Sequence, residues 1–239
     1  MSHFDQIKFV ENSRNFYLNN FEKCIDILEV GSLDINGTVR YLFKFAKSYI
    51  GIDLIDGNNV DLVLDGSNIQ KLSKKFDLII SCECFEHAMN WKDIFNIMIL
   101  NNKKNSIIIL TLASTGRIEH GTTRSGKWQS PGSKDEYYQN LTEKDFYENF
   151  DMNNIFSNHF FHYNINSYDL YFIGLIGHHD KSINLDKFHS ETINFYKTKK
   201  IRKILSRLIS LILGEKNRQD LHFFLKKFSK KSKNIVKKG

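Results

Sequence analysis

Apolar residues gather in short runs along the first half of the chain. Runs rich in β-branched residues predict buried strands over residues 25–30, 49–53, 60–65, 76–81 and 107–112. Segments with helical spacing lie at residues 3–22, 37–47 and 91–100. Strands that alternate with helices are typical of a parallel sheet covered on both faces. The pattern therefore predicts a doubly wound, Rossmann-like α/β fold.

The second half of the chain begins with a segment of a different kind. Residues 113–140 are polar and glycine-rich, and an irregular segment of this length is usually functional or disordered. A short helix is expected next, with Thr142 as its N-cap. Residues 156–163 and 169–176 then predict two strands joined by a short turn. This terminal antiparallel hairpin completes a seven-stranded mixed sheet.

The last part of the chain has a helical pattern of its own. Apolar residues at i, i+3, i+4, i+7, i+8 and i+11 predict an amphipathic helix that ends at Gly214; they are Ile201, Ile204, Leu205, Leu208, Ile209 and Ile212. A second basic stretch, residues 221–228, is expected to fray toward the C-terminus. We therefore divide the chain into a helical segment (1–23), a main domain (24–180, with an insertion at 113–140) and a basic helical tail (181–239).

Composition and charge narrow the class of protein. Hydrophobic residues make up 41% of the 239 residues, which excludes wholesale disorder. Three cysteines are too few for a disulfide framework and favour a reduced, cytoplasmic protein. The first residues resemble no secretory signal, and no apolar run is long enough to span a membrane. The net charge of +7 is uneven, because residues 197–239 hold 15 Lys and Arg against two acids.

Three interpretations of the basic tail stay open. The isoleucine and leucine stripe can pack on the chain's own body or on a second copy in a homodimer, which we favour. It can instead lie on an anionic membrane surface as a membrane-peripheral helix. Binding of nucleic acid is the least favoured, because the tail lacks interleaved aromatic residues and the rest of the chain is mildly acidic.

The turn after the first predicted strand has the features of a nucleoside site. Gly31 permits close approach of a ligand to the backbone at the carboxyl end of that strand. Asp53 ends the second strand, where a carboxylate can bind both hydroxyls of a ribose. These two residues predict a ligand that contains adenosine.

Charge in the same turn distinguishes two such ligands. A dinucleotide requires G-x-G-x-x-G, but Ser32 follows Gly31 and Asp34 lies in the loop. A carboxylate ~4 Å from a phosphate costs on the order of 4 kcal/mol at an effective dielectric constant of 20. S-adenosyl-L-methionine has no phosphate, and its ammonium can pair with Glu29 or Asp34. The turn therefore favours S-adenosylmethionine, with an NAD-dependent oxidoreductase as the alternative.

With these residues in view, the sequence resembles the class I S-adenosylmethionine-dependent methyltransferases of the small-molecule, type 11-like group. The resemblance covers residues 24–177 and is carried by ILEVGSLDINGTVR, YIGIDLIDGNNVDLVLDG, FDLIISCECFEH, IIILTLASTGRIEHGT and YYQNLTEKDF. The first block departs from the commoner E-x-G-x-G-x-G by lacking its middle glycine. The resemblance implies methyl transfer to a small-molecule or carbohydrate-like (glycan) acceptor, in surface-glycan or secondary-metabolite biosynthesis.

The resemblance also implies roles for individual residues. Glu29 and Gly31 would meet the methionine moiety, Asp53 the ribose and Asp65 the adenine amino group, while residues 82–87 would line the sulfonium and acceptor side. The full set of expected cofactor-binding residues is Glu29, Gly31, Ser32, Asp34, Gly37, Asp53, Leu54, Asp65, Gly66, Cys82 and Glu83.

A hydroxyl acceptor needs a group that removes its proton, and two histidines are candidates. His87 and His120 follow predicted strands, and imidazole titrates near neutral pH. Alternatively, His87 contacts backbone at a helix start and His120 orders its loop. The expected acceptor-binding residues are Glu86, Arg117, Glu119, Tyr137, Tyr138 and Asn140.

Arg117 can pair with an anionic acceptor, or it can serve with its neighbours in lid packing. No metal is expected, since no acidic cluster with ligand spacing follows the fourth or fifth strand. Two other classes stay open besides the oxidoreductase: an inactive cofactor-binding or regulatory protein of the same fold, and, on the tail alone, an RNA methyltransferase.

Overall fold

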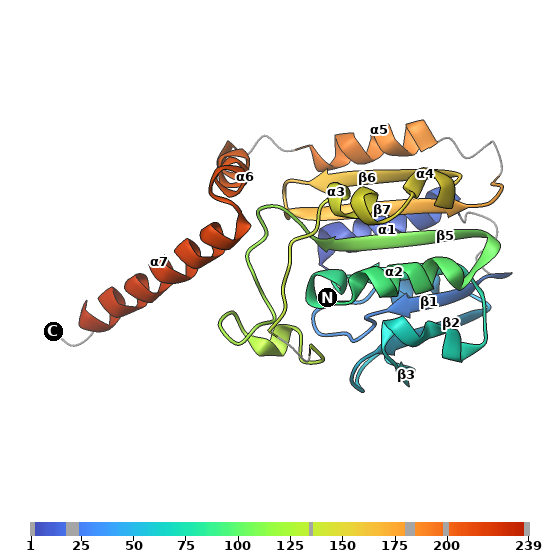
Figure 1. Cartoon of the computed structure of the whole chain (residues 1–239), viewed down its shortest axis with the longest axis horizontal. Coiled ribbons are helices and arrows are strands. Elements are labelled where there is room, and N and C mark those ends of the chain that lie inside the picture. Colours follow the sequence, from blue (N-terminus) through green and yellow to red (C-terminus); the bar gives the residue numbers. More distant parts are fainter. Residues whose placement is uncertain (1–2, 18–23, 134–135, 180–184, 198–200, 237–239) are drawn as a thin grey trace.

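The predicted strands form one sheet in the computed structural model, which describes residues 3–17, 24–133, 136–179, 185–197 and 201–236 (Figure 1). Its order is β3-β2-β1-β4-β5-β7-β6. The parallel strands are β1 (Asp26–Val30), β2 (Ser48–Asp53), β3 (Leu62–Val63), β4 (Phe76–Cys82) and β5 (Asn102–Ala113). Strand β7 (Asp169–Ile176) runs antiparallel to both β5 and β6 (Asn158–Asn164). The predicted seven-stranded mixed sheet with a terminal hairpin is confirmed.

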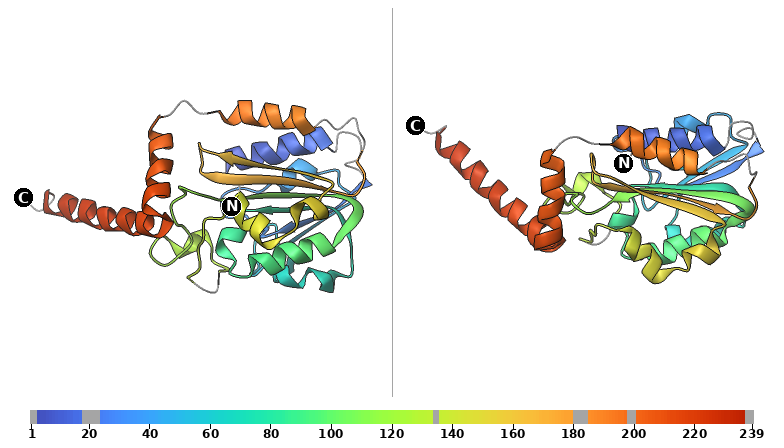
Figure 2. Two further views of the ribbon diagram at one scale, coloured as in Figure 1. Left: turned by 45° about the horizontal axis from the view of Figure 1, so that its top comes forward. Right: turned by 90° about the horizontal axis from the view of Figure 1, so that it is seen from above.

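Helices from both ends of the main fold cover one face of the sheet (Figure 2). These are α1 (Phe4–Tyr17) and α5 (Leu185–Tyr196), and the short 3-10 helix η2 (Arg40–Phe43) lies on the same face. The ring of Phe9 stacks on that of Tyr171 in β7 with centroids 4.8 Å apart. The apolar side of the N-terminal segment is therefore buried against the sheet.

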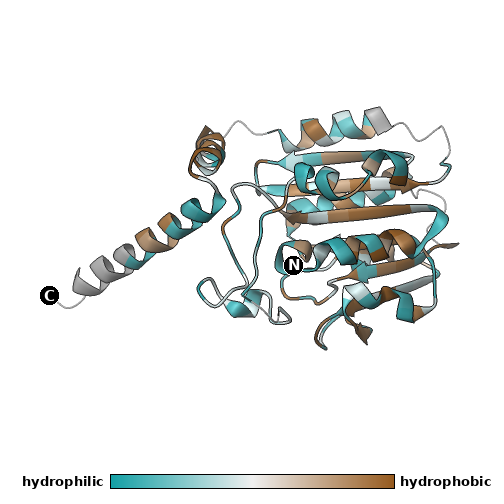
Figure 3. Ribbon diagram, in the orientation of Figure 1, coloured by the Kyte–Doolittle hydropathy of each residue, from teal (hydrophilic) through white to brown (hydrophobic). Residues whose placement is uncertain are grey.

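The opposite face is covered by helices from the middle of the chain. They are η3 (Gly66–Leu72), α2 (Trp91–Leu100), α3 (Glu143–Asn149) and α4 (Met152–Ile155). Phe95 of α2 lies at the centre of this layer, with ring contacts to Phe146 and Phe172. Figure 3 shows the apolar residues concentrated along the central strands between the two helical layers. Thr142 caps α3 as expected, in a capping box with Asp145.

The helix predicted over residues 37–47 is wrong, because only η2 forms there. The amides of Lys47 and Ser48 both donate to the Ile25 carbonyl, which fixes the start of β2. The Arg40 guanidinium is held by Asp61 at 2.8 Å. These long-range bonds turn the chain after a single helical turn, and local apolar spacing carries no sign of them.

Strand β1 carries a buried carboxylate, Glu29, whose hydrogen-bond partner lies on β2. Glu29 is 2% exposed, and its carboxylate accepts a hydrogen bond of 2.7 Å from the Tyr49 hydroxyl. Burial raises the pKa of Glu29 to about 7, although the hydrogen bond from Tyr49 opposes the shift. Glu29 is therefore a buried residue of the sheet, held by Tyr49.

The last two helices of the chain extend away from the sheet, whereas α5, which also belongs to the predicted tail of residues 181–239, packs on the sheet (Figure 1). The predicted amphipathic helix is confirmed as α6 (Ile201–Leu213), and Gly214 follows it with a φ of 77°. The second helix, α7 (Glu215–Val236), continues well past the stretch that was expected to be regular. The apolar stripe of α6 stays largely open to solvent, with Ile201 70% and Ile212 80% exposed. None of the helices in the described ranges has both the length and the hydropathy to cross a bilayer.

Polar residues at the start of α7 hold the insertion. The Glu215 carboxylate accepts hydrogen bonds from the Gly116 amide at 2.9 Å and the Asn140 side chain at 2.8 Å. The buried Gln219 side chain accepts from the Glu119 amide at 2.9 Å and donates to the Arg117 carbonyl at 2.7 Å. The tail is thereby fixed to both ends of the 113–140 segment.

The pKa of Glu29 predicts a pH-dependent stability. A folded-state pKa of about 7, above the ordinary 4.5, means that the folded state holds the proton more tightly. Stability therefore falls as pH rises between these values and stays low above them. Glu29→Gln keeps an acceptor for Tyr49 and removes the charge. We expect it to match the wild type near pH 4 and to be more stable by on the order of 3 kcal/mol at pH 8, measured by urea unfolding. A difference that is constant with pH would contradict this.

Gln219→Ala should loosen the insertion. The variant leaves the Glu119 amide without its acceptor, a loss of about 1–3 kcal/mol, and removes one of the two donors to the Arg117 carbonyl, the other being the Asn140 side chain. We expect the Glu119 amide to exchange its hydrogen roughly tenfold faster or more, by hydrogen–deuterium exchange. Exposed Lys216 on the same helix supplies the control, Lys216→Ala, which should leave that rate unchanged. Equal exchange in both variants would contradict the tethering.

Candidate functional site

A cavity of about 510 Å³ opens at the carboxyl ends of β1, β2 and β4. This is the edge at which open α/β sheets bind ligands. Eight of the expected site residues line it: Gly31, Asp53, Leu54, Asp65, Gly66, Glu83, His87 and Tyr137. The lining also includes residues that the sequence did not single out, among them Cys84, Ile94 and the stretch 129–133 of the insertion.

The glycine turn brings two strand ends together. Gly31 has a φ of 79°, and a Cβ built there would lie 2.7 Å from the Cβ of Cys84. The amides of Gly31 and Ser32 both donate to the Ile52 carbonyl. Only glycine fits this left-handed conformation and this close approach without strain. The turn therefore keeps the floor of the cavity open while the strands stay packed.

The carboxylate of Asp53 is fixed by two backbone amides. It accepts from Leu33 at 3.1 Å and from Leu54 at 2.7 Å. The insertion reaches the same point, since a Cβ at Gly132 would lie 3.3 Å from Asp53 Oδ1. Asp53 is thus preorganised at the cavity, with the insertion packed over it.

Asp65 and Gly66 form another part of the wall, where β3 leads into η3. The Asp65 carboxylate accepts from the Ser67 amide at 2.9 Å and from the Ser67 hydroxyl at 2.8 Å. A Cβ at Gly66 would lie 2.9 Å from a methyl group of Val30. This end of the cavity is therefore narrow and largely apolar, with Asp65 held as a helix cap.

Five expected cofactor-binding residues lie outside the cavity lining: Glu29, Ser32, Asp34, Gly37 and Cys82. Asp34 accepts from the Gly37 amide at 2.8 Å and from the Asn59 side chain at 3.2 Å. The Asp34 carboxylate is thus bonded within its own loop and does not line the cavity. The prediction that this carboxylate would repel a pyrophosphate bound there therefore loses its support. Cys82 is a buried thiol of β4, and Glu29 is held by Tyr49.

A buried ionic group lies beside the cavity. Arg117 lies 3.4 Å from Glu83 and 3.3 Å from Asp169, so its guanidinium is already paired inside the protein. Glu83 has a φ of 52° and also accepts a hydrogen bond from Gln6 of α1. Burial raises the pKa of Glu83, as does the nearby Asp169, while Arg117 opposes the shift. Burial, together with the nearby Glu83 carboxylate, also raises the pKa of Glu86.

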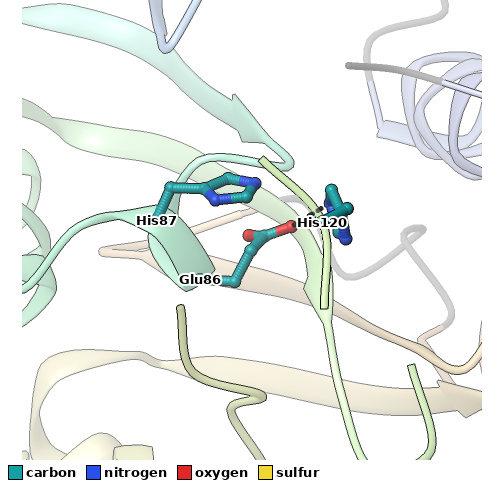
Figure 4. A group of neighbouring side chains, drawn as sticks. All are labelled: Glu86, His87 and His120. Atoms are coloured by element: carbon teal, nitrogen blue, oxygen red, sulfur yellow. Dashed lines mark ion pairs between the residues drawn. The ribbon is translucent and has the colours of Figure 1, made fainter. Parts of the chain in front are cut away.

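The two candidate histidines lie next to each other. The rings of His87 and His120 are 4.9 Å apart between centroids, and Tyr138 packs against both. Burial lowers the pKa of His87 to about 2 and that of His120 to about 4, so both are neutral at pH 7. Figure 4 shows them converging with Glu86, which comes from the same short helix as His87.

Three buried atoms of this group have no hydrogen-bond partner within the described ranges. They are Glu86 Oε2, His87 Nδ1 and His120 Nε2. An unsatisfied buried polar atom costs about 1–3 kcal/mol, so three in one place is a substantial cost. Such a concentration is unusual in a folded protein and singles out this group of side chains.

The remaining expected acceptor-binding residues have structural partners. Glu119 pairs with Arg124, and the Asn140 side chain donates to the Arg117 carbonyl at 2.9 Å. Tyr137 lines the cavity, and its hydroxyl donates to Gln139 at 2.6 Å. These residues shape the insertion, and of them Tyr137 alone reaches the cavity.

Solved structures with bound S-adenosylhomocysteine (SAH) are similar to this chain. The plantazolicin methyltransferase BpumL in complex with SAH has a TM-score of 0.52 at 16% identity, over 73% of this chain and 85% of that chain. The same enzyme with a triazolic desmethylPZN analog and SAH has a TM-score of 0.51 at 15% identity, over the same shares of the two chains. No family model matches the sequence, and neither does any curated protein. Sheet order and these similarities together show that the chain has the fold of the class I S-adenosylmethionine-dependent methyltransferases.

Proposed function

We propose that this protein is a methyltransferase that transfers the methyl group of S-adenosylmethionine to a small-molecule or carbohydrate hydroxyl. One observation carries the proposal: a cavity at the carboxyl edge of a methyltransferase-type sheet, bordered by the Gly31 turn and by a fixed carboxylate at Asp53. BpumL, which has a similar fold, was crystallised with SAH.

The cavity suits an adenosine-containing ligand at one end. Asp53 ends β2 with both carboxylate oxygens already oriented by backbone amides, and remaining lone pairs can accept from the hydroxyls of a ribose. Ile52, Leu64 and Ile94 supply apolar walls for an adenine ring. Gly31 provides the close backbone approach that the methionine part needs.

The other end of the cavity suits a hydroxyl acceptor. Glu83 and the neutral His87 both line it, and both can accept a hydrogen bond from a hydroxyl group. Methyl transfer is an in-line displacement, in which the acceptor oxygen attacks the methyl carbon as the carbon–sulfur bond breaks. Holding the two reactants in line can supply roughly 7–11 kcal/mol of the barrier. The insertion packs over the cavity, which favours such a fixed arrangement.

The location and assembly of the protein belong to the same proposal. We place the protein in the cytoplasm, a compartment that keeps cysteines reduced and that would supply S-adenosylmethionine. The open stripe of α6 supports a homodimer formed through the tail helices. The alternative occupant of the stripe is an anionic membrane surface, and salt-sensitive binding to vesicles would identify it.

Asp53→Ala should weaken SAH binding. Loss of the carboxylate removes the acceptor for the ribose hydroxyls, and we expect a loss of about 1–3 kcal/mol by isothermal titration calorimetry. Asp56→Ala is a matched control, because Asp56 is an exposed acid three residues further along the same loop. Equal SAH affinity in both variants would contradict the ribose assignment, and binding of NAD in place of SAH would favour the oxidoreductase.

The acceptor class can be tested by product analysis. Incubation with S-adenosylmethionine that carries a labelled methyl group and an extract of small molecules and glycans should label a hydroxyl of one compound, located by mass spectrometry. Asp53→Ala protein should label it more slowly, since it binds the cofactor less tightly. A label on nitrogen, carbon or RNA would overturn the oxygen and small-molecule assignments. Cofactor binding without any labelled product would favour the alternative of an inactive cofactor-binding or regulatory protein of the same fold.

A further inference from the structure

We infer that Glu86, His87 and His120 bind a divalent transition-metal ion at the acceptor end of the cavity. Each side chain offers one potential ligand atom, and these atoms all lie within 4.8 Å of one another. The three come from two separate elements, η4 (Phe85–His87) and the insertion, and Figure 4 shows them pointing toward one another. This site differs from the sequence-based expectation that no metal is used.

The spacing is close to what an ion requires. A tetrahedral ion with ligand bonds of about 2.1 Å holds its ligand atoms roughly 3.4 Å apart. Separations within 4.8 Å therefore close by small side-chain rotations. Glu86 is 0% exposed and His120 is 8% exposed, so the ligand atoms are shielded from bulk water.

The hydrogen bonds of His120 prepare it as a ligand. Its Nδ1 lies 3.2 Å from the Ile118 carbonyl, which can only accept, so Nδ1 carries the proton. The unpaired Nε2 therefore presents a lone pair toward the two carboxylates, 3.6 Å from Glu83 and 4.0 Å from Glu86. A backbone carbonyl that fixes the tautomer in this way is the usual outer support of a metal-binding histidine. His87 Nδ1 and Glu86 Oε2, both buried and without a partner within the described ranges, complete the set.

The local charge favours a cation. Glu83, Glu86 and Asp169 are buried carboxylates, and the Arg117 guanidinium lies between two of them, Glu83 and Asp169. Within the described ranges, no lysine or arginine lies as close to Glu86 as Arg117 lies to Glu83 and Asp169. The basic side chain nearest to Glu86 in these ranges is His120, at 4.0 Å. A divalent ion bound by Glu86 would supply the cationic partner that this buried carboxylate lacks within the described ranges.

The ligand types indicate which ion. Two imidazoles and one carboxylate suit Zn²⁺, Mn²⁺ or Fe²⁺, whereas Mg²⁺ and Ca²⁺ prefer oxygen ligands. Three protein ligands leave a coordination position open. Of the three ligands, His87 lines the cavity, so an open position on its side of the ion would face the acceptor.

The role of the ion rests on the proposed function. An acceptor hydroxyl bound at the open position becomes more acidic and loses its proton to water. Its oxygen then forms the bond to the methyl carbon, and the carbon–sulfur bond breaks with its electron pair left on sulfur. The histidines in this account are ligands that position the ion, and the ion, in place of an imidazole base, activates the hydroxyl.

The test is a calorimetric titration of the full chain with Zn²⁺ after removal of bound metal by a chelator. We expect one equivalent to bind to the wild type. His120→Ala and Glu86→Gln should each weaken that binding on the order of tenfold or more. His162→Ala is the matched control, because His162, like His87 and His120, has a buried nitrogen without a partner in the described ranges, but it lies on β6 against Tyr171. Its variant should bind Zn²⁺ as the wild type does. No binding to the wild type, or unchanged affinity in both ligand variants, would overturn the inference.

Titration with SAH separates this inference from the proposed function and also shows whether the variants are folded. Zn²⁺ binding that depends on Glu86 and His120, without SAH binding, would keep the metal site and overturn the methyltransferase. SAH binding without Zn²⁺ binding would do the reverse. If both variants fail to fold, Co²⁺ added to the wild type decides: visible absorption of a four- or five-coordinate ion, lost on addition of Zn²⁺, supports the site, and the spectrum of hydrated Co²⁺ overturns it.

Discussion

The close contact between the Gly31 turn and Cys84 is the constraint on which the site depends. It holds the ends of β1 and β4 together with no side chain between them, and the two amides bound to Ile52 tie the same turn to β2. A cavity can therefore open directly above three strand ends without a break in the sheet below. The carboxylate at Asp53 and the polar end of β4 both face this space because the turn does not fill it.

Three segments that are far apart in the sequence converge on the acceptor end. Helix α1 contributes Gln6, which binds Glu83, and the segment just before it contributes His3, 2.7 Å from Asp169. The insertion contributes Arg117 and His120, and the tail holds the insertion in place. Buried charges cost free energy unless they are paired, and Glu83 and Asp169 are each matched by groups from other segments. Glu86 is the member of this group whose match is incomplete.

The sequence was sufficient for the fold, and it named eight of the residues that line the cavity. The spacing and composition of the apolar runs locate the strands, because both are local properties of the sequence. Asp53 could be named because a carboxylate at the end of the second strand lies at the edge where α/β sheets bind ligands. The helix expected after Gly37 fails because long-range bonds of Arg40 and Lys47 override local spacing. The meeting of His120 with His87 could not be predicted, since the path of an irregular segment is set by contacts such as Gln219, about a hundred residues away. Asp34 shows the same limit, because nothing in its spacing shows that it would turn into its own loop.

The tether between α7 and the insertion has a kinetic consequence. Residues 129–133 cover the cavity, and the stretch before them is anchored by Gln219 and by the pairing of Arg124 with Asp220. In the proposed methyltransferase, cofactor that passes this stretch on its way in or out would do so at a rate that depends on contacts made outside the cavity. A partner seated on the tail helices would therefore alter turnover by changing residence times, while every group that touches the reactants stayed as it was.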